Sequence, residues 1–149
     1  MPNIVHRIGT EKATIKEMYD TLAKVEGLVK WWTPNVSGES KIGSKLKFLF
    51  PKKGPEFEVI DLKPLKRVEW KCVKGPEEWV DTHIEFIISK NNKESVLLFK
   101  HGGWREESEF MRHCSTQWAY FIIGLRKYFE TGKGTPYGDG LERISQWST

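Results

Sequence analysis

The chain has 149 residues, of which 38% are hydrophobic, 30% charged and 13% aromatic, and these proportions are typical of one folded domain that is rich in rings. No apolar signal-peptide core occurs near Met1, and no run of about 18 apolar residues occurs anywhere, so we expect a cytoplasmic protein without a membrane span. The two cysteines, Cys72 and Cys114, are expected to be free, buried thiols rather than a disulfide.

The net charge of +4 raises the question of nucleic-acid binding, and the basic residues do cluster locally, at Lys41, Lys45, Lys47, Lys52 and Lys53. Within this segment Lys45 and Lys47 alternate with apolar residues, which predicts a strand with its lysines on the solvent side. No nucleic-acid-binding motif accompanies the charge. We therefore expect a solvated hairpin and no nucleic-acid partner.

The first quarter of the chain predicts a short strand followed by two short helices. The strand covers residues 4–8. Thr14 and Glu17 form a capping-box pattern that opens a helix reaching Leu22. A second helix is expected over residues 25–32, where Thr33-Pro34 stops it. Trp31 and Trp32 stand at this helix end, and we expect one of the two in the core because sequence neighbours point in different directions.

Residues 45–101 predict a series of antiparallel strands, because apolar and polar residues alternate between turn signals. Gly75-Pro76 and Asn91-Asn92 mark two of the turns. Gly102-Gly103 ends the series. The expected strands cover residues 45–50, 57–62, 68–72, 79–88 and 95–101.

Residues 107–131 hold a helical period of apolar residues for many turns, which predicts one long helix that packs on this sheet. Gly132 is suited to cap its end. Gly124 inside it suggests a close backbone approach, to the sheet or to the first helix. Beyond the domain expected over residues 1–136, a tail over residues 137–149 carries Leu141, Ile144 and Trp147 at helical spacing.

This order of elements resembles the helix-grip fold of the START/SRPBCC superfamily, an α+β fold in which a curved antiparallel sheet surrounds one long C-terminal helix. Several motifs resemble its branch named after the activator of the HSP-ninety ATPase. The resemblance covers Met1 to about Pro136. The motifs are 31–34 (WWTP), 43–48 (GSKLKF), 62–70 (LKPLKRVEW), 101–104 (HGGW), and Trp118, Leu125, Tyr128, Glu130, Gly132, Gly134 and Pro136.

The resemblance implies an apolar cavity between sheet and long helix that holds small hydrophobic molecules in many members. Other members are polyketide cyclases or aromatase-like enzymes, and the chaperone activator uses such a domain to bind protein. We therefore expect binding of a lipid-like or polyketide-like ligand. The alternatives are a protein-interaction module, using the basic strand or the Trp147 tail, and a cyclase or hydrolase. The chain could act as a monomer or a homodimer.

The side chains expected to line this cavity are Trp32, Phe48, Trp70, Cys72, Phe86, Phe99, His101, Phe110, Cys114 and Trp118.

His101 is the one candidate for general acid or base catalysis. The resemblance would place it near the cavity mouth and near Glu109, Phe110 or His113. The alternative is that His101 anchors the Gly102-Gly103 turn by a backbone hydrogen bond. His113 and Cys114 point about 100° apart on the helix, so a Cys/His nucleophile pair is not expected. The histidines and cysteines show no zinc-ligand spacing and no phosphate-binding glycine loop occurs, so we expect no metal and no cofactor.

Overall fold

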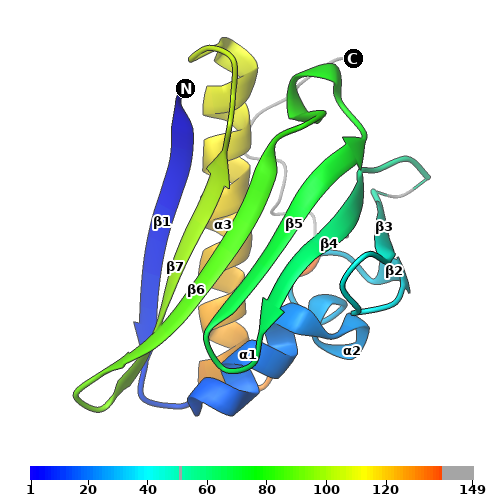
Figure 1. The fold of residues 1–149 in the computed structure, drawn as a ribbon. Coiled ribbons are helices and arrows are strands. Elements are labelled where there is room, and N and C mark those ends of the chain that lie inside the picture. Colours follow the sequence, from blue (N-terminus) through cyan, green and yellow to red (C-terminus); the bar gives the residue numbers. More distant parts are fainter. Residues whose placement is uncertain (51, 139–149) are drawn as a thin grey trace.

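A seven-stranded antiparallel sheet curls around one long helix, α3 (Figure 1). This computed structural model describes residues 1–50 and 52–138. The strands lie in the order β1-β7-β6-β5-β4-β3-β2, so the first and last strands of the chain pair with each other. Their bounds are β1 Asn3–Thr10, β2 Asn35–Gly38, β3 Lys45–Leu49, β4 Glu56–Lys63, β5 Arg67–Lys74, β6 His83–Asn91 and β7 Glu94–Gly102.

The helices begin and end where their capping residues allow. In α1 (Ile15–Ala23), the Thr14 side chain accepts a hydrogen bond from the backbone N–H of Glu17 at 3.0 Å, which confirms that the helix starts at the predicted pair. The long helix α3 spans Glu109–Thr131, two residues shorter than predicted, because Ser108 is its N-cap. Gly132 closes it with a φ of 83°, as expected. Within the described residues no helix is long and apolar enough to cross a bilayer.

Three predicted features of the fold were wrong. The second helix, α2, covers only Val25–Leu28. Both Trp31 and Trp32 are buried. The chain after α2 is irregular, which allows the two rings to stack on the same side with their centroids 6.2 Å apart. The strand expected over residues 79–88 begins at His83, because Asp81 has a φ of 72°, and it is preceded by a 3₁₀ helix, η1 (Glu77–Trp79). The short strand β2 was not predicted.

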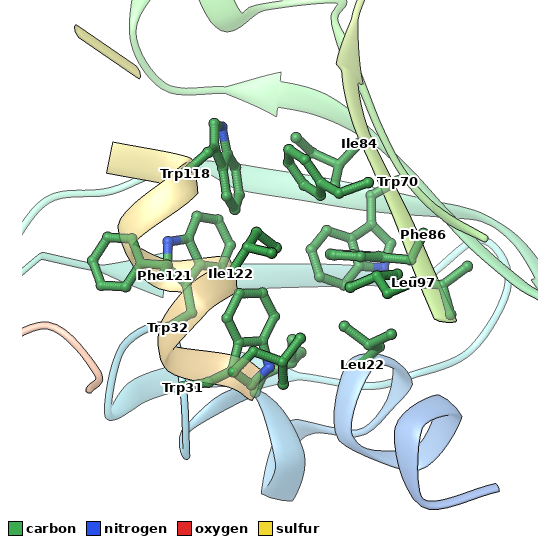
Figure 2. Close-up of a cluster of buried hydrophobic side chains, with 14 of the residues drawn as sticks. Leu22, Trp31, Trp32, Trp70, Ile84, Phe86, Leu97, Trp118, Phe121 and Ile122 are labelled. Carbon is green, nitrogen blue, oxygen red and sulfur yellow. The ribbon is translucent and has the colours of Figure 1, made fainter. Parts of the chain in front are cut away.

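The core lies on the concave side of the sheet, where the side chains of the strands meet those of the helices. Figure 2 shows Trp118, Phe121 and Ile122 of α3 next to rings of the sheet and the pair Trp31-Trp32. From the sheet come Trp70, Ile84, Phe86 and Leu97, and α1 contributes Leu22. Such burial stabilises by about 1.5 to 3 kcal/mol per large side chain.

Gly124 does mark a close approach, but its partner is neither the sheet nor α1. A Cβ at this position would stand 2.1 Å from Thr135 Oγ1, so the segment after α3 folds back against the helix. The predicted helical turns around Leu141, Ile144 and Trp147 lie outside the described residues.

Candidate functional site

The side chains predicted to line a cavity do converge between the sheet and α3. All are buried, with at most 5% exposed, except Phe110, which is half-buried and packs against the same cluster. They come from the concave faces of β3, β5, β6 and β7, from the segment after α2, and from the first half of α3. The six of them that lie on strands face inward because period-2 strands send every second residue to one face.

The rings in this interior contact one another directly. The Trp32 ring lies 4.4 Å from Phe48 and 4.8 Å from Trp118, centroid to centroid. Trp70 lies 5.5 Å from Phe48 and 5.2 Å from Phe86. Centroid distances of about 4.5 to 7 Å are those of packed aromatic pairs. A molecule entering here has to displace rings.

His101 stands at the centre of a chain of buried hydrogen bonds. Trp118 Nε1 lies 3.0 Å from His101 Nδ1, and Thr82 Oγ1 lies 2.8 Å from His101 Nε2. An indole N–H can only donate, so Nδ1 is the acceptor and the neutral ring carries its proton on Nε2. That proton is donated to Thr82 Oγ1, whose hydroxyl donates to the backbone O of Trp79.

Two further tryptophans enclose His101. Trp104 Nε1 donates to the backbone O of His101 at 3.1 Å, and the Trp79 ring meets the imidazole edge-on at 4.8 Å. Trp79 Nε1 in turn donates to Cys114 Sγ at 3.4 Å. The η1 segment is thus joined to β7 and to α3 at the same place.

This environment removes His101 from acid–base chemistry at neutral pH. Its side chain is 0% exposed, and burial lowers its pKa to about 3. It therefore does not lie at a cavity mouth. In this structure its ring joins β7 to Trp118 of α3 and to Thr82, and no hydrogen bond within the described residues connects the ring to the Gly102-Gly103 backbone.

The two thiols are equally unsuited to nucleophilic chemistry. Burial raises the pKa of Cys72 to about 11 and that of Cys114 to about 12. Both are free, as predicted. Within residues 1–50 and 52–138, no group of three or more His, Cys, Asp or Glu side chains could hold a metal ion.

Among the described residues, several buried polar atoms lack a hydrogen-bond partner, including Trp70 Nε1, Gln117 Oε1, Tyr120 Oη and Thr135 Oγ1. Trp70 is 0% exposed, yet its Nε1 meets no hydrogen-bond acceptor among the described residues. Leaving a buried donor unpaired costs about 1 to 3 kcal/mol. In Trp118, Trp104, Trp79 and Trp31 the indole N–H is paired, so Trp70 differs from its neighbours.

Trp79 and Thr82 were not recognised as partners of this site from the sequence. Thr82 was placed correctly on the inward face of its predicted strand. Trp79 was predicted as the first residue of that strand, because the turn was expected to end at Gly75-Pro76, whereas the 3₁₀ helix η1 continues it through Trp79. The lysines of β3 face Glu58 and Glu56 on β4, in the register Lys45 to Glu58 and Lys47 to Glu56.

The sequence profile of the family described as "Activator of Hsp90 ATPase homolog 1-like protein" matches residues 12–130. The chain belongs to this family. No curated protein sequence matches it. The solution structure of the Aha1 dimer from Colwellia psychrerythraea is 41% identical, with a TM-score of 0.82, and the match covers 90% of this chain and all (100%) of that one.

More distant solved structures share the fold. Protein SSP2350 from Staphylococcus saprophyticus is 10% identical, with a TM-score of 0.73 over 90% of this chain and 96% of that one. CalU16 from Micromonospora echinospora is 14% identical, with a TM-score of 0.69 over 87% of this chain and 76% of that one. The family and these neighbours confirm the predicted helix-grip fold.

Proposed function

We propose that this family member binds a small, largely apolar molecule between the sheet and α3. The ligand carries one hydrogen-bond acceptor, such as a carbonyl or a hydroxyl oxygen, and places it against Trp70 Nε1. The rings around Trp70 supply the affinity. Because those rings are in contact, binding is coupled to their displacement, and the occupied state is a different packing of the same side chains.

The observation that carries this proposal is the unpaired indole N–H of Trp70 in a fully buried position. A ligand oxygen there would remove the cost of the unpaired donor. The second support is chemical. His101, Cys72 and Cys114 are neutral and sealed from solvent, so the interior offers apolar contact and hydrogen bonding rather than proton transfer.

Matched pairs of ligands test the proposal. Calorimetry would compare a polycyclic aromatic ketone with the hydrocarbon of the same shape, for the wild-type protein, Trp70→Phe and the control Trp118→Phe. We expect Trp70→Phe to lose about tenfold in affinity for the ketone only, which is the contribution of one hydrogen bond. Trp118→Phe, an equal truncation, should affect both ligands alike. Equal losses in both variants would contradict the proposal.

A second candidate function is protein binding, which the family's description favours. As one part of it, we propose that the chain self-associates. The support is the 41% identical relative, whose solution structure is described as a dimer and whose whole length this chain covers. Sedimentation equilibrium over a wide range of concentration tests this. A mass that stays at one chain throughout would contradict self-association.

A further inference from the structure

The outer, convex face of the sheet carries an open groove of about 470 Å³ over three neighbouring strands, β1, β7 and β6. In Figure 1, β7 and β6 cross in front of α3 and β1 lies beside it at the left. The register defines two rows of outward side chains across them. One row is Val5, Lys100 and Glu85, and the other is Arg7, Leu98 and Ile87. We refer to these six residues as the outer strip.

The outer strip exposes three large apolar side chains on one face of the sheet. Val5 is 63% exposed, Leu98 44% and Ile87 37%. Leu98 and Ile87 are direct cross-strand neighbours, so the exposed surface is continuous rather than scattered. Contiguous apolar surface that is flanked by charges is typical of sites where proteins associate.

We infer that the outer strip is the contact between two copies of this chain. This inference rests on the self-association proposed above. An isologous contact places the same surface on both copies, so the surface must complement itself. The apolar centre of the outer strip can pack on its own copy. Glu85 is paired within the chain with Arg67 and, at 3.8 Å, with Lys100, so the opposite charges beside that centre already offset one another. A surface of one charge sign would repel its copy.

The position of the outer strip in the sheet supports a second copy further. Lys45 and Lys47 lie on β3, near the far end of the strand order. Contact through β1, β7 and β6 therefore leaves the lysine-rich segment of each copy away from its counterpart, which matters for chains of net charge +4.

The contact uses the face of the sheet rather than the edge of β1. Arg126 Nε of α3 donates to the backbone O of Gly9 on β1 at 2.9 Å. The long helix therefore already occupies part of this edge. Stable interfaces involve roughly 20 to 30 residues per partner, so a contact centred on the six residues of the outer strip predicts a weak dimer.

Sedimentation equilibrium of three variants locates the contact. Leu98→Glu and Ile87→Lys each place a charge in the outer strip, and Ile123→Glu places one at a more exposed apolar position (64%) on α3. We expect each strip variant to raise the dissociation constant of the dimer at least tenfold, and the Ile123 control to leave it unchanged. Melting temperatures near that of the wild type would show that all three fold.

The outcomes separate the two proposals. If the wild type dimerises and both strip variants dimerise equally well, the outer strip is not the contact, although the chain does self-associate. A dimer lost in the Ile123 control but not in the strip variants would also overturn it. A wild-type protein that remains a monomer would overturn self-association and the outer strip together.

Discussion

Trp118 of α3 donates a hydrogen bond to His101 of β7 across 3.0 Å, in a place where the histidine is 0% and the tryptophan 2% exposed. This bond joins the long helix to the sheet inside the core. It also fixes the tautomer of His101, and so the direction of the bonds to Thr82 and Trp79. His101, for which the sequence left both acid–base chemistry and a turn anchor open, is hydrogen-bonded to two other elements of the core in this structure.

We expect His101→Leu to lower the free energy of unfolding by about 2 to 4 kcal/mol, because it leaves the Trp118 N–H unpaired in the core and takes a partner from Thr82. Trp118→Phe should destabilise the His101→Leu variant less than it destabilises the wild type, because the hydrogen bond is already lost in that variant. Urea denaturation of the double-mutant cycle should give a coupling of about 1 to 2 kcal/mol. A coupling near zero would mean that the bond is not formed.

Acid should destabilise the protein through His101. Its pKa is about 3 in the folded state and about 6.5 when unfolded. The unfolded chain therefore binds the extra proton between these values, and stability present above pH 6.5 is lost as the pH falls. We expect the wild type to lose about 1.4 kcal/mol per pH unit more than His101→Asn, which has no titrating ring. Parallel pH profiles of the two proteins would contradict this.

The fold could be predicted because its signals are local. The capping pair Thr14 and Glu17, the alternation of β5, and Gly132 after α3 each act within a few residues. The hydrogen-bond partners of His101 could not be predicted, because Thr82 and Trp118 lie 19 and 17 positions away in the sequence. Nor could the unpaired N–H of Trp70, because alternation gives the direction of a side chain and not what its polar atom meets.

Trp79 should protect Cys114 from thiol reagents. Its indole donates to Cys114 Sγ and also stacks near Trp118, at 6.1 Å. We expect Trp79→Ala to raise the labelling rate of Cys114 by a disulfide reagent, because the variant both uncovers the sulfur and admits solvent around it. Mass spectrometry of the labelled peptides measures the two cysteines separately. Cys72 is the internal control, and a rate that rises equally at Cys72 would indicate general unfolding instead.

Gly124→Ala should destabilise the protein although alanine favours helices. The new Cβ would stand 2.1 Å from Thr135 Oγ1, which costs more than the roughly 1 kcal/mol gained in helix propensity. Thr135→Ala removes that oxygen and should restore stability in the double variant. Thermal unfolding of the two single variants and the double variant checks this. A Gly124→Ala protein more stable than the wild type would disprove the close approach.

The indole N–H resonance of Trp70 tests the proposed ligand site most directly. In a ¹H–¹⁵N spectrum it is assigned by its absence in Trp70→Phe, and it can be followed during titration with aromatic ketones and with lipids. We predict a downfield shift on binding, as the unpaired donor gains an acceptor, while the already bonded Trp118 N–H moves less. If no ligand of either class shifts the Trp70 resonance, the interior is solid core and the proposed function is wrong.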